Sequence, residues 1–310
     1  MKVPSVKVPG PVTVRVKPGL PGYTEVMTVE SLTILEARAW LVGRLSELGV
    51  ASSAAEASLL LESLLGLTRT DLLLARGRSV SADQKRFLEA QLARRAGGEP
   101  LQHILGTAHF YGLDLRVTKD VLIPRPETER LVELALETVA PLPAPKILDV
   151  GTGSGAVALA LQLERPDATA LASDVSEAAL AVAAENGARH ELSVTFVKSD
   201  LLTASVVQSF AANLDLLVAN LPYLPAGDAA WLSLEVRREP GLALFSGPDG
   251  LAHFRRLVRQ AHPLLKEGAV CWLELDPRNV RQAQTEVNDW AEATVLSDLA
   301  GRERFLKLVR

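Results

Sequence analysis

The sequence contains few groups that could cross-link the chain or hold a metal. Cys271 is its one cysteine, so no disulfide can form within the chain. It lies in the apolar run 269–273, a pattern typical of a strand, and we expect a buried, inert thiol there. The five histidines show no metal-ligand spacing, and we therefore expect no metal site.

Long apolar runs and a surplus of basic residues are also missing. No stretch reaches the roughly 18–20 apolar residues that a membrane-spanning helix needs, and the N-terminal residues lack the apolar centre of a signal peptide. We therefore expect a cytoplasmic protein with no membrane partner. The net charge of −4 argues against stable nucleic-acid binding, because proteins that hold long nucleic acids usually carry a basic excess.

The first third of the chain predicts a tail followed by helices. Residues 1–28 are rich in proline, glycine and lysine, which is typical of a flexible tail. Residues 29–105 show the three- and four-residue spacing of helices. The face expected for the first helix consists of Leu35, Ala39, Val42, Leu45 and Leu48. Ser53 with Glu56 resembles a capping box that opens a second helix, and Ser81 opens a third.

The remaining residues predict a hairpin and then an α/β domain. Alternating apolar residues in 106–123 indicate a β-hairpin linker, and the 124–310 domain begins at a stiff Pro-Arg-Pro turn. From Lys146 onward, short apolar strands alternate with helices. The expected strands are 146–150, 169–173, 194–198, 215–219 and 269–275, followed by two short closing strands. Such alternation predicts a mainly parallel sheet with helices on both faces.

A glycine-rich loop follows the first of these strands and predicts a nucleotide-type cofactor. Gly151-Thr152-Gly153-Ser154-Gly155 allows a tight turn and a close approach of the backbone, ahead of a helix whose free N–H groups favour an anion. The carboxylate of S-adenosylmethionine and a dinucleotide pyrophosphate both fit this loop, and Ala156 is compatible with the dinucleotide fingerprint. Asp174 ends the next strand, where an acid can accept both ribose hydroxyls of either cofactor.

The third strand ends in a second candidate cofactor contact. Asp200 could accept from an adenine amino group while Leu201 covers one face of the ring. The alternative is that Asp200 caps the next helix.

The four residues Asn220-Leu221-Pro222-Tyr223 distinguish between the two cofactor classes. An amide nitrogen is a poor nucleophile because its lone pair is delocalised. The Asn220 side-chain oxygen and the Leu221 carbonyl could each accept one hydrogen of a planar NH2 group, while Pro222 stiffens the turn and Tyr223 stacks on the plane. Catalysis would then consist mostly of orientation, with Asn220, Pro222 and Tyr223 as the catalytic residues. A nicotinamide dehydrogenase would leave these residues unexplained.

The chain resembles the HemK/PrmC family of release-factor glutamine methyltransferases from about residue 29 to its end. The resemblance rests on the following segments: GEPLQHILG (98–106), FYGL (110–113), LIPRPETE (122–129), the glycine loop, NLPY (220–223), EP (239–240), DGL (249–251) and DLAG (298–301). It implies a Rossmann-like, seven-stranded class I methyltransferase domain. It also implies that the preceding helical domain docks class 1 release factors, and that the glutamine of their Gly-Gly-Gln loop is methylated on N5. S-adenosylmethionine would be converted to S-adenosylhomocysteine.

By position, the resemblance assigns cofactor contacts to the glycine loop, Asp174, Leu201 and Asn220. Phe110 is expected either to wall the glutamine pocket or to pack in the core, and Arg125 either to clamp the domain junction or to touch the substrate. Leu221 departs from the proline of the family, which loosens the loop by roughly 0.4–1 kcal/mol. The alternatives are a methyltransferase acting on an exocyclic amine of adenine, cytosine or guanine, and a relative that binds a partner without catalysis.

Overall fold

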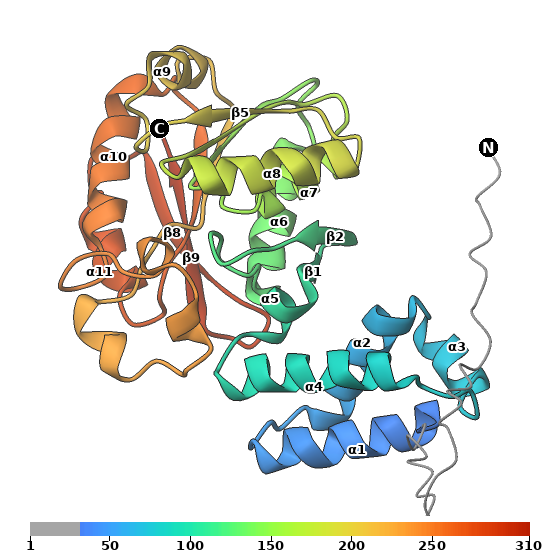
Figure 1. The fold of residues 1–310 in the computed structure, drawn as a ribbon. Helices are drawn as coiled ribbons and strands as arrows, with labels where there is room; N and C mark the ends of the chain where they lie inside the picture. The colour runs from blue at the N-terminus through green and yellow to red at the C-terminus, as the bar shows by residue number, and fades with distance from the viewer. Residues whose placement is uncertain (1–31) are drawn as a thin grey trace, which may run out of the picture.

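The computed structural model describes residues 32–310 (Figure 1). The tail predicted for residues 1–28, and the first residues of the predicted helical domain, lie outside the described residues. None of the helices in 32–310 combines the length and apolar character needed to cross a bilayer.

Five helices form the N-terminal part of the described chain. They are α1 (Ile34–Glu47), α2 (Ser53–Leu65), α3 (Arg69–Leu74), α4 (Ala82–Ala96) and α5 (Leu101–Leu105). The helix expected at Ser81 is confirmed: its hydroxyl accepts from the Gln84 amide, and the Gln84 side chain accepts from the Ser81 amide. The capping box expected at Ser53 is wrong, because Ser52 is the N-cap and makes no side-chain capping bond, while Glu56 pairs with Arg95.

The buried face of α1 differs from the predicted one. Ile34, Ala37, Leu41 and Leu45 are buried, whereas Leu35 and Leu48 are 58% and 45% exposed. Two apolar sets with helical spacing overlap in this segment, and the sequence alone does not show which set the neighbouring helices cover. The buried set packs against α2 and α4 in a compact leucine-rich core.

A short hairpin and one helix lead into the sheet domain. Strands β1 (Thr107–Phe110) and β2 (Leu113–Arg116) pair in antiparallel fashion. Helix α6 (Pro126–Val139) begins with a proline, whose fixed φ and missing N–H suit the first helical position.

The larger part of the chain is a seven-stranded sheet in the order β5-β4-β3-β6-β7-β9-β8. Its strands are β3 (Lys146–Val150), β4 (Thr169–Asp174), β5 (Val194–Lys198), β6 (Leu216–Ala219), β7 (Val270–Glu274), β8 (Glu292–Ser297) and β9 (Glu303–Val309). All neighbouring strands are parallel except β9, which runs antiparallel to β7 and β8. This arrangement confirms the expected α/β, Rossmann-like class I methyltransferase fold.

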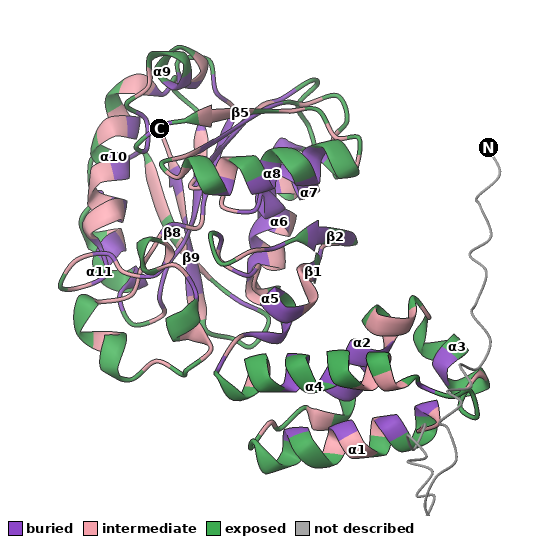
Figure 2. Ribbon diagram, in the orientation of Figure 1, coloured by how far each residue is buried: buried purple, intermediate pink, exposed green. Residues whose placement is uncertain are grey.

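Helices cover both faces of the sheet, and the central strands are buried on both sides (Figure 2). The helices of the sheet domain after α6 are α7 (Ala156–Glu164), α8 (Glu177–Arg189), α9 (Ser205–Ala211), α10 (Ala252–Leu264) and α11 (Val280–Thr285). Strand β3 is followed along the chain by β4 on one side, while β6 lies on its other side. Ligands of open α/β sheets bind beyond the carboxyl ends of the strands at such a switch in strand order.

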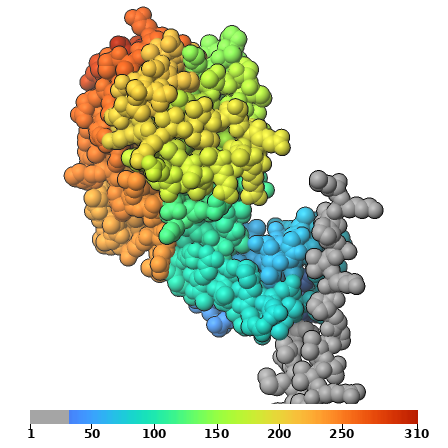
Figure 3. Space-filling view, turned by 45° about the horizontal axis from the view of Figure 1, so that its top comes forward, coloured from blue at the N-terminus to red at the C-terminus, as the bar shows by residue number. Residues whose placement is uncertain are grey.

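The segment 220–250 joins the two parts of the molecule, which appear as separate lobes in Figure 3. It contains three short 3-10 helices, η1 (Ala226–Ala230), η2 (Val236–Arg238) and η3 (Gly241–Ala243). Arg95 at the end of α4 pairs with Glu235 at 2.6 Å, and Arg238 donates to the Gly97 carbonyl at 2.7 Å. Gly98 has a positive φ and lies so close to Leu234 that a Cβ would approach the leucine Cβ to 2.9 Å.

Candidate active site

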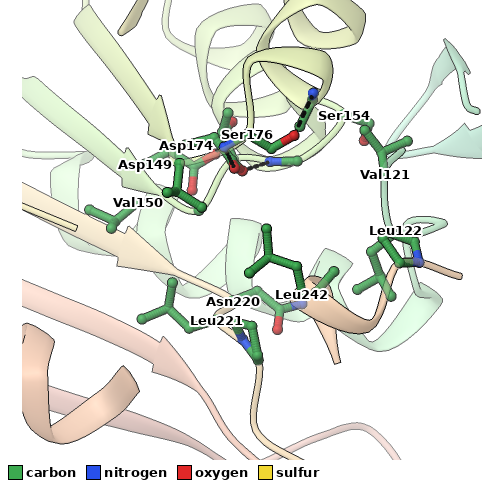
Figure 4. A pocket seen from close by; sticks show the side chains of 18 of the residues that line it. Val121, Leu122, Asp149, Val150, Ser154, Asp174, Ser176, Asn220, Leu221 and Leu242 are labelled. Atoms are coloured by element: carbon green, nitrogen blue, oxygen red, sulfur yellow. Dashed lines mark hydrogen bonds between the residues drawn. The ribbon is translucent and has the colours of Figure 1, made fainter. Parts of the chain in front are cut away.

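A cavity of about 270 Å³ opens at the carboxyl ends of β3, β4 and β6 (Figure 4). The predicted site residues that line it are Gly151, Thr152, Gly153, Ser154, Asp174, Asp200, Leu201, Asn220, Leu221 and Pro222. The structure thus brings together residues that are up to 71 positions apart in the chain, from Gly151 to Pro222.

The glycine loop adopts the conformation that its composition predicts. Gly151, Gly153 and Gly155 have φ values of 76°, 56° and 84°, a region that side chains with a Cβ avoid. Gly155 is not among the cavity-lining residues; it is the N-cap of α7, and a Cβ there would lie 3.2 Å from Ala183 Cβ. This glycine therefore allows α7 and α8 to pack closely, while the other two face the cavity.

Asp174 ends β4 with its carboxylate held by backbone groups. The Gly153 amide donates to one oxygen and the Ser176 amide to the other, each at 2.9 Å. Each carboxylate oxygen retains a further lone pair. The side chain is therefore fixed at the cavity wall and still able to accept hydrogen bonds from a ligand hydroxyl.

Asp149 is a cavity-lining acid that no prediction singled out. It is 2% exposed and accepts from the Thr152 hydroxyl at 2.6 Å and from the Ala158 amide at 3.2 Å. Burial raises the pKa of this carboxyl to about 7, against the opposing effect of the two hydrogen bonds. Its position two residues before Gly151, in the strand that leads into the glycine loop, was the available signal in the sequence.

The residues after β5 lie at the cavity as predicted. Leu201 is buried with a positive φ of 54°, an unusual conformation that holds its side chain against the cavity. The Asp200 carboxylate pairs with Arg256. The alternative role for Asp200, as a side-chain cap of the next helix, is wrong: Ala204 is the N-cap of α9 and has no side-chain capping bond.

Asn220 follows β6 and has one satisfied and one unsatisfied side-chain atom. Its Nδ2 donates to Thr128 Oγ1 at 3.0 Å. Its Oδ1 is buried and has no hydrogen-bond partner within residues 32–310. Since buried polar atoms nearly always have a partner, an unpaired acceptor in a cavity-lining residue indicates a site for a ligand N–H or O–H.

Leu221 contacts the glycine loop. Its side chain is 8% exposed, and its Cδ2 lies 2.7 Å from the position that a Cβ on Gly151 would occupy. The leucine thus fills the space that the missing Gly151 side chain leaves. In Figure 4, Asn220 and Leu221 lie across the cavity from Asp174 and Ser154.

Tyr223 and Phe110 do not line the cavity. Tyr223 was predicted to stack on the substrate amide, and Phe110 either to wall the glutamine pocket or to pack in the core. Burial raises the pKa of the Tyr223 hydroxyl far above its usual range, with Glu274 close by. Phe110 is 1% exposed and packs in the core with Leu113, Leu115 and residues of α6. Of the two expectations for Phe110, the structure shows packing in the core and not a position in the pocket wall. Stacking of Tyr223 on the substrate stays a prediction.

Arg125 joins two of the motif segments. It pairs with Glu239, whose side chain is 1% exposed, and the second oxygen of Glu239 accepts from the Ile123 amide at 3.0 Å. The pair holds the Pro-Arg-Pro turn against the 220–250 segment. This agrees with the expectation that Arg125 acts as a clamp. Arg125 also lines the cavity, so a substrate contact is compatible with this geometry.

Several further residues at the cavity were not predicted. They are Val121, Leu122, Pro124, Thr128, Ser199, Pro240, Leu242, Ala243 and His253, along with other lining positions. His253 lies 2.8 Å from the Ser246 hydroxyl through Nδ1, and burial lowers its pKa. These residues come from several helices and loops, and only the tertiary fold brings them together at the cavity.

Comparison with known proteins gives matches over most of the chain. A family model described as the PrmC N-terminal domain matches residues 36–106, and one described as the methyltransferase small domain matches residues 129–232. The release factor glutamine methyltransferase of Deinococcus radiodurans is 43% identical over 269 residues, covering 86% of this chain and 95% of that protein. The enzyme of the same name from Caulobacter vibrioides is 38% identical over 280 residues, covering 88% and 96%.

A solved structure gives the same fold at low identity. The hMettl16 catalytic domain in complex with a 3′UTR hairpin matches with a TM-score of 0.52 and 14% identity, covering 75% of this chain and 82% of that one. This likeness supports the methyltransferase fold alone.

Proposed function

This chain belongs to the release factor glutamine methyltransferase family, and we propose that it methylates the side-chain amide nitrogen (N5) of the glutamine in the Gly-Gly-Gln loop of class 1 peptide chain release factors. It is a protein methyltransferase, and the resemblance noted from its motifs is confirmed by relatives that span nearly its whole length. The alternative of an exocyclic nucleic-acid amine is not favoured by these relatives.

The cavity fits S-adenosylmethionine as the methyl donor. When bound, this cofactor supplies a methyl group on a sulfonium sulfur. Gly153 leaves room for close approach to the backbone, and Asp174 presents fixed acceptor lone pairs suited to the ribose hydroxyls. Leu201 offers an apolar surface for the adenine ring. The structural observation that supports this fit is the open space at Gly153, where a Cβ would have no heavy atom within 4 Å.

The glutamine amide would be held at the opposite wall. The single observation that carries this proposal is the buried, unpaired Oδ1 of Asn220 at the cavity. This oxygen accepts one amide hydrogen and the Leu221 carbonyl accepts the other, which leaves the nitrogen lone pair free to face the methyl donor. Restricting rotation of the amide in this way favours the reactive geometry, and the excess proton leaves to solvent after methyl transfer.

The helices α1–α5 would dock the body of the release factor. Their family model is separate from that of the sheet domain, and they are joined to the cavity by the 220–250 segment. We assign residues 29–105 to this docking role, 106–123 to the linker and 124–310 to catalysis.

The proposed function is tested by methyl transfer to a purified release factor. The full-length protein is incubated with S-adenosylmethionine and the release factor, and the Gly-Gly-Gln peptide is analysed by mass spectrometry. One added methyl group on the glutamine is expected. A release factor with the glutamine replaced by alanine serves as the control and should gain none. An unmodified peptide, together with methylation of RNA or DNA in a parallel reaction, would favour the nucleic-acid alternative.

A further inference from the structure

The orientation of the Asn220 carboxamide is not determined by its shape. Its oxygen and nitrogen occupy nearly equivalent positions, so a half-turn about the last side-chain bond would exchange them. After such a turn the NH2 group would face the cavity, and the side chain would repel the substrate N–H instead of accepting it. A neighbouring group must therefore distinguish the two orientations.

The only side-chain hydrogen bond of Asn220 within residues 32–310 goes to Thr128 on α6, with Nδ2 at 3.0 Å from Oγ1. A hydroxyl can donate or accept, and so it does not select an orientation by itself. It selects one only if its hydrogen is engaged elsewhere, because the oxygen must then accept from Nδ2.

Glu274, at the end of β7, is the group placed to take that hydrogen. Its side chain is 1% exposed, and in the described part of the chain neither carboxylate oxygen has a hydrogen-bond partner. Strands β6 and β7 run parallel with Ala219 opposite Leu273, so Glu274 and Asn220 follow side by side at the carboxyl ends of neighbouring strands. The nearby Thr128 hydroxyl favours the ionised form of this carboxylate. An ionised carboxylate only accepts, so it turns the hydroxyl hydrogen towards itself and the oxygen lone pair towards Asn220.

None of the charged neighbours of Glu274 in residues 32–310 forms a hydrogen bond with its carboxylate. Arg304 on β9 approaches it to 3.8 Å but lies closer, at 3.3 Å, to Asp298. Glu127 on α6 and Asp298 in the β8–β9 turn are acids and repel its charge. Tyr223 is the remaining group that faces it.

We infer that Thr128 and Glu274 are positioning residues that hold the Asn220 carboxamide with its oxygen towards the substrate amide; this inference rests on the proposed function. Neither residue touches the reacting atoms. Glu274 orients the Thr128 hydroxyl, and the hydroxyl orients Asn220.

The arrangement has a consequence for pH. Burial raises the pKa of Glu274 to about 7. Once protonated, the carboxyl can donate to Thr128 Oγ1, and the hydroxyl hydrogen is then free to point at Asn220 and stabilise the wrong orientation. Turnover should therefore fall as the pH drops below about 7. The pKa of Asp149, which lines the cavity near the glycine loop, is raised to a similar value. A variant is therefore needed to show which of the two carboxyls causes the fall in turnover.

The first test compares Thr128→Val with Thr128→Ser. Valine keeps the shape and removes the hydroxyl, so kcat with release factor should fall about 10- to 100-fold, as for other lost orienting hydrogen bonds. KM for the release factor and the calorimetric Kd for S-adenosylhomocysteine should change less than about threefold. Serine should restore at least a third of the wild-type kcat.

Thr138→Val is the matched control on the same helix. Thr138 accepts from Trp272 Nε1 at 2.9 Å but lies away from the cavity, so this variant should lose stability and keep its kcat. An unchanged kcat in Thr128→Val, or a loss of S-adenosylhomocysteine affinity as large as the loss of kcat, would overturn the inference. Wild-type enzyme that fails to methylate the release factor would instead refute the proposed function.

The second test is the pH profile of kcat. Glutamine does not titrate, so Glu274→Gln should lose the fall in kcat below about pH 7 that the wild type shows. S-adenosylhomocysteine binding, measured at the same pH values, should stay within about threefold of wild type. An acid limb that persists unchanged in Glu274→Gln would remove Glu274 from the inferred arrangement.

Discussion

The helical part and the sheet domain satisfy their polar groups to different degrees. In the helices, Thr33, Thr68 and Ser81 each complete a reciprocal capping box, and Glu56 is paired with Arg95. Within residues 32–105, the one buried side-chain atom without a hydrogen-bond partner is His103 Nε2. In the sheet domain, by contrast, buried side-chain atoms without partners gather near the carboxyl ends of the strands. In residues 32–310 they include atoms of Ser173, Asn220, Glu274 and Asn279.

This difference suits the two proposed roles. In the proposed docking module, the three capping boxes stabilise helices that are too short to form alone. A site that must hold a polar ligand has to keep some acceptors unpaired, and the surrounding sheet provides the stability that this requires. The following predictions test the contrast, from the largest expected effect to the smallest.

Asn220→Ala removes the unpaired acceptor at the centre of the contrast. We expect kcat to fall by about 100- to 1000-fold, roughly 3–4 kcal/mol in the activation free energy, because the substrate amide loses its orienting oxygen. Affinity for S-adenosylhomocysteine, measured by calorimetry, should fall much less. A variant that keeps the wild-type rate would show that this side chain does not hold the amide.

Glu274→Gln should change how stability depends on pH. The pKa of Glu274 is about 7 in the folded chain against 4.5 for an ordinary glutamate. Between these values the folded chain keeps a proton that the unfolded chain releases, so the free energy of unfolding falls as the pH rises. The loss amounts to about 3 kcal/mol and is complete above pH 7.

Denaturant unfolding of both proteins at pH 5 and pH 8 measures this effect. The wild type should lose about 3 kcal/mol more than Glu274→Gln over this range. Asp149 titrates in both proteins, so its contribution cancels. Equal losses in the two would mean that the Glu274 carboxyl is not held in an apolar environment.

Arg95→Met tests the helical part, in which the buried charges are paired. Arg95 and Glu56 are 8% and 9% exposed, and the substitution leaves the glutamate buried without its partner. We expect the free energy of unfolding to fall by about 2 kcal/mol, less than the roughly 3–5 kcal/mol for a buried charge left with no partner, because the Ser52 hydroxyl still donates to Glu56. Arg44→Met, in the exposed Arg44–Glu47 pair, is the control and should change it by less than about 0.5 kcal/mol.

Leu221→Pro should give the smallest effect. Proline stiffens the loop, which we expect to raise kcat about two- to fivefold, in line with roughly 0.4–1 kcal/mol for one loop residue. Loss of the leucine packing against Gly151 should lower the free energy of unfolding by about 1 kcal/mol. Leu221→Ala loses the packing without making the loop stiffer, so its kcat should not rise. If kcat did rise in Leu221→Ala, the gain in Leu221→Pro would come from the smaller side chain and not from a more rigid loop.

The sequence predicted the elements whose signal is local. The strand Lys146–Val150, the start of α6 near its proline and the left-handed glycines all follow from patterns a few residues long. Asp174 and Asn220 were recognised because each directly follows a strand of a predicted parallel sheet. Their convergence then follows from the sheet itself.

Other features depend on partners far away in the chain and were missed. The role inferred for Thr128 depends on its hydrogen bond with Asn220, which is 92 residues away in the chain. The role inferred for Glu274 depends in turn on its position near Thr128. The buried face of α1 was misassigned because two overlapping apolar patterns fit equally well until α2 and α4 are in place. Helix α9 carried too weak a pattern in the sequence to be predicted.

The 220–250 segment gives the molecule a short mechanical path between its lobes. Its Pro240, Leu242 and Ala243 form part of the wall around the cavity, while Glu235 and Arg238, only a few residues earlier, grip the end of α4. A displacement of α4 would therefore act on the cavity wall by two routes: through this segment, and through the segment 119–125, which follows α5 and the hairpin along the chain and also lines the cavity.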